Sequence, residues 1–211
     1  MRNLLVVIVL FSCFSVLAQK VDGNKVCSYK MDAELVQKVL SANISETDKA
    51  NRQVMIDFIE RFCGAYEVKD IDFIQKVFSG DTLLFVGGNL KPVLSIKTEN
   101  KQNAARMNYM MQGKKQYLSI LQKIFSKNAS IQVLLDDVVV KVHPDKSSIY
   151  GLTLRHGWTT EYYGDKGYLF MLWDFTNSEV PQIYVRTWQP DKIPGTPIDE
   201  EEIFTIDDFE V

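Results

Sequence analysis

Four long segments with alternating apolar and polar residues make up most of the C-terminal half of the chain. They span residues 131–142, 148–161, 166–176 and 182–188. The links between them contain Pro144-Asp145, Gly164-Asp165 and Asn177-Ser178, which are residue types that favour turns. Strands joined by such short links pair with their neighbours in antiparallel fashion. We therefore expect an antiparallel meander.

The preceding part of the chain has helical spacing. A short helix is expected at residues 31–40, and Thr47 is a suitable N-cap for a longer one. Asp70 can cap a third helix, residues 82–86 form a candidate strand, and a further helix is expected from Lys114. The stripe of the long helix is wide enough to pack against a sheet. It consists of Val54, Met55, Phe58, Ile59, Phe62, Cys63 and Tyr66.

The N-terminus has the composition of a secretory signal at residues 1–19. Arg2 precedes an apolar stretch of about 14 residues, which is shorter than the roughly 20 needed to span a bilayer. No later segment is apolar enough to span, so we expect export to the periplasm or the extracellular space. The alternative, a lipoprotein anchored through Cys13, is disfavoured by the bulky Phe11. Export would permit a Cys27–Cys63 disulfide, although Cys63 also fits a buried thiol.

The composition excludes several function classes. The chain has 24 Lys+Arg against 27 Asp+Glu, which gives no indication of nucleic-acid binding. Two His and three Cys leave little material for a metal site, and the sequence has no phosphate-binding loop or nucleophile motif. No metal, cofactor or catalytic residue is therefore predicted. Of 211 residues, 46% are hydrophobic, which suits a single domain.

The chain divides into four parts. After the signal come an N-terminal extension with the short helix at residues 20–46, a domain at 47–190 and an acidic tail at 191–211. The tail has eight acidic residues against one lysine and contains Pro194, Gly195 and Pro197. We interpret it as a solvated segment.

The domain resembles the nuclear transport factor 2-like superfamily, including its polyketide-cyclase-like and ketosteroid-isomerase-like branches. The resemblance rests on residues 58–66, 70–74, Phe78, Thr82 and the closing strands at 167–174 and 183–188. It implies an α+β cone, in which a curved antiparallel sheet wraps around N-terminal helices and leaves a pocket at its open end. The superfamily contains isomerases, cyclases, hydratases, epoxide hydrolases and binding modules, and the chain is similar to its secreted bacterial members.

Strand alternation suggests which side chains face this pocket. A two-residue turn at Asp165-Lys166 would place Trp158 opposite Trp173, and the next link would place Trp173 opposite Tyr184 and Met171 opposite Arg186. The candidate ligand-binding residues on this face are His156, Trp158, Trp173, Tyr184, Arg186 and Trp188. The reverse face is also apolar and needs a cover, so we expect a homodimer through it. Its residues are Tyr168, Phe170, Leu172, Ile183 and Val185.

Each candidate has two interpretations. Arg186 requires either an acid, Glu60 or Asp57, or an anionic ligand. His156 could be a general base or a structural histidine, and the tryptophans could stack on a ligand or fill the core. The sequence favours an exported protein that binds a small amphipathic or aromatic molecule, with an anion as one option. The alternatives are an isomerase- or cyclase-type enzyme that uses His156 with a Tyr donor, and a protein-protein interaction module that uses the outer sheet face.

Overall fold

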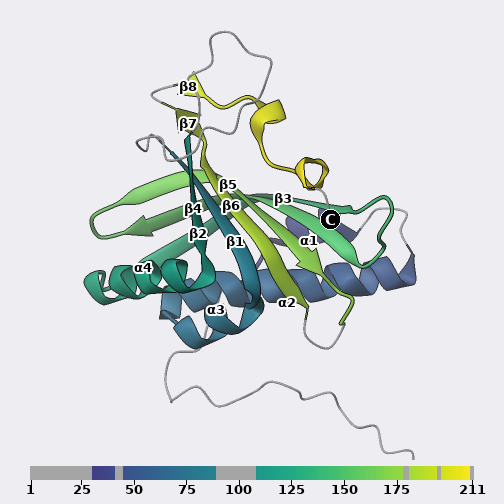
Figure 1. Ribbon diagram of the computed structural model, residues 1–211, viewed down its shortest axis with the longest axis horizontal. Coiled ribbons are helices and arrows are strands. Elements are labelled where there is room, and N and C mark those ends of the chain that lie inside the picture. The colour runs from purple at the N-terminus through teal and green to yellow at the C-terminus, as the bar shows by residue number, and fades with distance from the viewer. Residues whose placement is uncertain (1–29, 41–44, 89–107, 178–180, 194–195, 210–211) are drawn as a thin grey trace, which may run out of the picture.

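A curved sheet is covered on one face by helices, and the C-terminal segment lies on its other face (Figure 1). The computed structural model describes residues 30–40, 45–88, 108–177, 181–193 and 196–209. The helices are α1 (Ala33–Leu40), α2 (Glu46–Val68), α3 (Ile71–Val77) and α4 (Lys114–Lys127). The long strands are β1 (Phe78–Gly88), β2 (Asn108–Gly113), β3 (Ile131–Val142), β4 (Ile149–Thr160), β5 (Gly164–Asp174) and β6 (Gln182–Pro190). The C-terminal segment contains β7 (Lys192–Ile193), β8 (Thr196–Pro197) and the 3₁₀ turns η1 (Glu200–Glu202) and η2 (Ile206–Asp208).

The predicted α+β class and the meander are confirmed. The six-stranded sheet has the order β2-β1-β6-β5-β4-β3, and β3 to β6 pair with their sequence neighbours in antiparallel fashion. β1 pairs with β2 in antiparallel fashion and with β6 in parallel fashion, so the sheet is mixed at this point. The four meander strands lie within two residues of their expected positions, whereas β1 begins four residues earlier than expected and β2 was not predicted.

Helix α2 packs its apolar stripe against the concave face of the sheet, except for Val54, which is exposed. Its N-cap is Ser45 and not Thr47, because the Ser45 hydroxyl accepts a hydrogen bond from the Asp48 amide. The helix ends at Lys69, whose left-handed conformation lets its amide bond to carbonyls of the last turn. Asp70 caps α3 as predicted, through a 3.0 Å bond from the Phe73 amide. Phe62 and Cys63 are buried in this core.

The β4–β5 hairpin has a different register from the expected one. Trp158 lies opposite Asp165, and the residue opposite Trp173 is Tyr150. The turn therefore lies about four residues earlier than predicted, which changes the register by eight. Because eight is an even number, each side chain keeps its predicted face. The predicted pair of Met171 and Arg186 is confirmed.

The outer face of the sheet is partly covered by the chain's own C-terminal segment. Ile206, only 3% exposed, packs with Ile149, Phe170 and Leu172, and Phe209 stacks on Phe170 at 5.1 Å between ring centroids. The interpretation of the tail as solvated is therefore wrong for residues 204–209. The apolar residues of this segment stand between its acids and pack against the apolar outer face of the strands. The cover expected from a second copy is supplied here by the same chain.

Two sequence predictions lie outside the described residues. Residues 1–29, with the predicted signal and Cys27, are not among them, so neither export nor the disulfide is tested. Within the described part of the chain, no helix is both long and apolar enough to cross a membrane.

Candidate functional site

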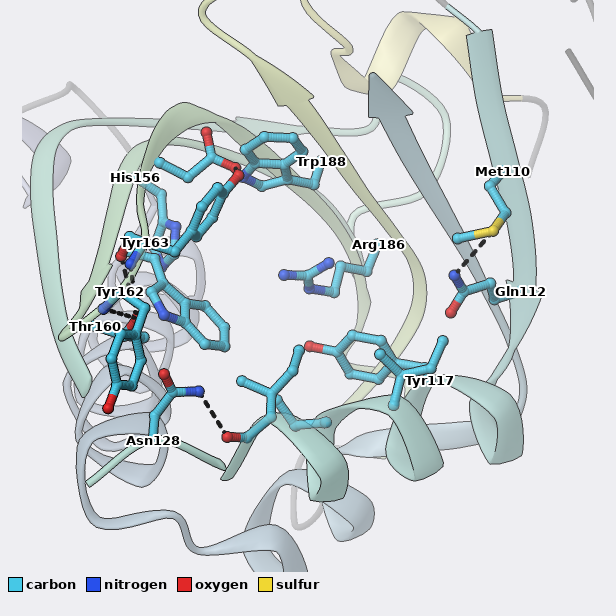
Figure 2. Close-up of a pocket in the computed structure, with 15 residues that line it drawn as sticks. Met110, Gln112, Tyr117, Asn128, His156, Thr160, Tyr162, Tyr163, Arg186 and Trp188 are labelled. Atoms are coloured by element: carbon cyan, nitrogen blue, oxygen red, sulfur yellow. Dashed lines mark hydrogen bonds between the residues drawn. The ribbon is translucent and has the colours of Figure 1, made fainter. Parts of the chain in front are cut away.

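A cavity of about 490 Å³ lies between helix α4 and the concave face of the sheet (Figure 2). The long side chains around it come from separate parts of the chain. The described lining residues are Met110, Gln112, Tyr117, Ile120, Leu121, Ile124, Asn128, His156, Trp158, Thr160, Tyr162, Tyr163, Asp165, Arg186 and Trp188. Most of this wall is apolar or aromatic, as in typical small-molecule sites.

Two periodicities produce this lining. On β4 and β6 the lining residues are two apart, His156 with Trp158 and Arg186 with Trp188, because alternate side chains of a strand share a face. On α4 they recur at spacings of three and four, which is the period of one helix face. That set consists of Tyr117, Ile120, Leu121 and Ile124. The sheet therefore supplies the polar and indole groups, and the helix supplies most of the aliphatic wall.

Arg186 is the most unusual group of the cavity. It is 6% exposed, and its guanidinium points into the cavity (Figure 2). Its central carbon lies 5.2 Å from the centroid of the Tyr117 ring, a cation–π contact. Among the described residues, no carboxylate forms an ion pair with Arg186, and its buried Nε has no hydrogen-bond partner.

The two carboxylates expected for Arg186 have other partners. Glu60 pairs with Lys30 at 2.5 Å and accepts a bond from the Met31 amide. Asp57 accepts a bond from the Gln53 amide group at 2.9 Å. The internal salt bridge to the long helix, one of the two interpretations of Arg186, is therefore not formed.

A pair of tyrosines lies beneath this cation. The hydroxyls of Tyr66 and Tyr117 share a hydrogen bond, and the Tyr66 ring packs edge-on against Trp158. Burial, followed by the neighbouring Tyr117, raises the pKa of Tyr66 well above its usual range. The Tyr66 phenol is therefore neutral at physiological pH and places no negative charge beside Arg186.

His156 is buried and neutral. Burial, followed by repulsion from Arg186, lowers the pKa of His156 to about 3. Its Nδ1 has no hydrogen-bond partner in the described part of the chain, and the same is true of the Trp158 indole nitrogen and Gln112 Oε1. Buried polar atoms of this kind are uncommon in folded proteins, and several occur together around one cavity.

Four of the six candidate ligand-binding residues line this cavity: His156, Trp158, Arg186 and Trp188. Trp173 lies elsewhere, fully buried in the core, with its ring centroid 4.2 Å from that of Phe58. Whether the four bind a ligand stays a prediction.

Tyr184 is on the opposite side of the sheet and 41% exposed. The cause is a β-bulge between Leu172 and Trp173, which pairs Trp173 with Ile183 in place of Tyr184. Tyr184 and Trp173 border a separate hollow beside the β3–β4 turn.

Several lining residues were not predicted. Tyr117 and Leu121 lie on the helix expected from Lys114, but helical spacing alone does not show that one side of this helix borders a cavity. Gln112 lies in a stretch without readable pattern. As for metals, the described residues contain no group of three or more His, Cys, Asp and Glu side chains placed to hold an ion.

Solved structures with the same fold are distantly related in sequence. One assigned as a scytalone dehydratase from Novosphingobium aromaticivorans has a TM-score of 0.54 at 8% identity, over 70% of this chain and 88% of that one. Naphthalene 1,2-dioxygenase with indole bound in its active site has a TM-score of 0.51 at 9% identity, over 77% of this chain and 89% of that one. Bd1075 of Bdellovibrio bacteriovorus has a TM-score of 0.50 at 15% identity, over 74% of this chain and only 44% of that one.

No protein-family model and no curated protein sequence matches the chain. At identities this low, the likeness to the solved structures concerns the fold, and the fold supports many unrelated functions. The function has to be inferred from the side chains of the cavity.

Proposed function

We propose, on the premise that this chain has the nuclear transport factor 2-like fold, that it binds a small apolar molecule carrying one negative charge. The ligand would occupy the cavity beneath α4, with its anionic group against Arg186. The neighbours in fold include an enzyme assigned as a dehydratase and a dioxygenase, so the fold accommodates small-molecule sites.

The observation that carries this proposal is the buried guanidinium without a carboxylate among the described residues. An unpaired charge removed from water is costly, and an anion of matching geometry offsets that cost. The planar guanidinium suits a carboxylate in particular, because it can donate two parallel hydrogen bonds. The neutral state of Tyr66 and His156 leaves Arg186 as the charge that selects the ligand.

The rest of the cavity suits a flat apolar body. Trp158 and Trp188 lie on the sheet side, and the aliphatic chains of α4 lie opposite. A volume of about 490 Å³ is in the usual range for small-molecule sites, roughly 300–1,000 Å³.

We favour binding over catalysis because of His156. The enzyme alternative needs His156 as a proton acceptor with a Tyr donor, and a pKa of about 3 makes it a weak base in the free protein. Tyr117, the tyrosine beside Arg186, already shares its hydroxyl with Tyr66. No specific observation favours a reaction at this site.

The test compares 2-naphthoate with the neutral 2-naphthalenemethanol, followed by tryptophan fluorescence or calorimetry on the purified protein. The wild type should bind the carboxylate at least about tenfold more tightly, since charged hydrogen bonds contribute about 1.5–3 kcal/mol. Arg186→Met should abolish this preference while keeping affinity for the naphthalene ring.

The matched control is Arg155→Met, because Arg155 is exposed and lies on the other face of β4. It should bind both compounds like the wild type. Equal binding of the two compounds by the wild type, or an equal loss in both arginine variants, would contradict the proposal.

Export and dimerisation remain predictions of the same proposal. A protein exported through residues 1–19 would meet its ligand outside the cytoplasm. A homodimer through the outer face would have to use what the C-terminal segment leaves uncovered, including the exposed Leu134 and Val139 of the edge strand β3. The same restriction applies to a protein-protein interaction module that uses this face.

A further inference from the structure

The cavity has a buried floor and an exposed mouth. At the floor, Gln112 and Arg186 are 4% and 6% exposed. At the mouth, Ile120, Tyr163 and Tyr162 are 36%, 61% and 85% exposed, although all three border the cavity. Figure 2 shows Gln112, Arg186 and Tyr117 on one side of the cavity, with Tyr162 and Tyr163 on the opposite side.

The lining residues belong to different rows of the sheet. Arg186 lies in the row of the sheet that contains Met171 and Leu152. Along β4, Trp158 is six residues beyond Leu152, which corresponds to roughly 20 Å of strand. The lining therefore combines Arg186 on β6 with residues at the β4–β5 turn, Tyr162 and Tyr163.

The two tyrosines at the mouth are held by a well-bonded turn. The Thr160 amide donates to the Tyr163 carbonyl at 2.7 Å, and the Thr160 hydroxyl accepts from the amides of Tyr162 and Tyr163. The Tyr163 hydroxyl donates to Asp165 at 2.7 Å. Exposed aromatic side chains on such a fixed turn form a rim typical of binding sites.

The positive and the negative charge of the lining lie at different ends of the cavity. Among the described lining residues, Arg186 is the cation and lies at the floor, whereas Asp165 is the acid and lies beside the mouth tyrosines. An anionic group is attracted to the first position and repelled at the second.

We propose that the ligand is an elongated amphipathic anion that enters head first, with its anionic group at Arg186 and its far apolar end beside Tyr162 and Tyr163. This inference rests on the proposed function and adds the length and the orientation of the ligand. The class includes alkyl- or aryl-substituted aromatic acids, whose apolar tail is longer than a single ring.

The test uses benzoate, 4-butylbenzoate and 4-octylbenzoate as probes, with affinities measured by calorimetry. Each methylene that enters apolar surroundings should raise the affinity up to about fourfold, so affinity should increase along the series. Arg186→Met should weaken all three compounds by a similar factor, because they share the head group. The double variant Tyr162→Ser/Tyr163→Ser should weaken 4-octylbenzoate several-fold more than benzoate, because only the longer tail reaches the mouth.

Tyr184→Ser is the matched control, since Tyr184 is an exposed tyrosine outside the cavity; it should leave the whole series unchanged. The inference is overturned if affinity does not increase with tail length, or if the double variant weakens benzoate and 4-octylbenzoate equally. If those results occur while 2-naphthoate still requires Arg186, only the length and orientation are wrong. If no carboxylate binds at all, the proposed function is overturned as well.

Discussion

The two faces of the sheet are completed in different ways. On the outer face, the buried amide of Gln189 donates to the Glu202 carbonyl and accepts from the Phe204 amide, so the C-terminal segment is tied to the strands through satisfied polar groups. On the inner face, Arg186, Trp158 and Gln112 border a cavity with polar atoms that have no partner among the described residues. The tail covers part of the outer face, whereas part of the inner face is left unfilled, and for this reason we propose the inner face as the place for a ligand.

Removing the tail should have the largest effect on stability, because it uncovers the outer face of the sheet. Deletion of residues 199–211 would uncover Phe170 and Leu172 and leave the Gln189 amide without its partners. We expect a loss of about 3 kcal/mol or more in unfolding free energy, since burial of one large apolar side chain contributes about 1.5–3 kcal/mol. Denaturant unfolding measures the loss, and size-exclusion chromatography should show new self-association through the uncovered face. An unchanged midpoint with a monomeric product would contradict the assigned role of the tail.

A single methyl group added at Gly151 should loosen the packing of the C-terminal segment on the outer face of the sheet. A Cβ at this position would lie 2.7 Å from Ile206 Cβ and 3.0 Å from a Phe170 ring carbon. Gly151→Ala should therefore destabilise the fold by about 2 kcal/mol, because overpacking of a dense contact costs about 1–3 kcal/mol. Gly157→Ala on the same strand is the control, since its Cβ would have ordinary contacts at 3.6 Å or more. Equal unfolding midpoints for the two variants would show that the tail does not pack closely at Gly151.

On the inner face, His156 should make stability depend on pH. Its pKa is about 3 in the folded protein and about 6.5 in the unfolded chain, so the unfolded state binds more protons as the pH falls. The contribution is complete above pH 6.5 and is lost progressively toward pH 3, with about 2 kcal/mol gone at pH 5. Compared with the wild type, His156→Gln should show a weaker fall in unfolding free energy between pH 7 and pH 5. His143→Gln should keep the wild-type slope, and the same slope in all three proteins would show that His156 is not held neutral.

The smallest expected effects come from two tryptophan substitutions, one of which should change stability and the other ligand affinity. Trp173→Phe should lower stability by about 1 kcal/mol, because Trp173 is fully buried against Phe58, and should leave 2-naphthoate affinity unchanged. Trp158→Phe should lower that affinity with less effect on stability, because Trp158 borders the cavity. Thermal unfolding and fluorescence titration of both variants test the assignment, which fails if the two variants behave alike.

The sequence predicted the faces of the strands better than their alignment. The alternation on β4 placed His156 and Trp158 on the inner face, and an error of eight residues in the hairpin left this unchanged because eight is even. The β-bulge at the Leu172–Trp173 pairing with β6, in contrast, changes the face of a side chain because it shifts the register by one residue. One extra residue moved Tyr184 to the other side, and alternation alone does not reveal where a bulge occurs.

The tail and the cavity show a second limit of sequence reasoning. The many acidic residues at the C-terminus indicated a solvated segment. Ile206 and Phe209 were therefore not predicted to be buried, because their packing depends on an apolar strand face that is distant in sequence. Similarly, the helix α4 was predictable, but whether its Leu121 and Ile124 fill the core or border a cavity depends on how far the helix lies from the sheet. These features are tertiary, and local patterns do not encode them directly.

The most direct test of the central claim is a crystal structure of the protein with 6-bromo-2-naphthoate, in which anomalous scattering locates the bromine. We expect the carboxylate within hydrogen-bond distance of the Arg186 guanidinium and the bromine on the side of Tyr162 and Tyr163. A carboxylate placed at the mouth would contradict the head-first orientation. A compound bound only outside the cavity, with the cavity unchanged around Arg186, would contradict the binding function itself.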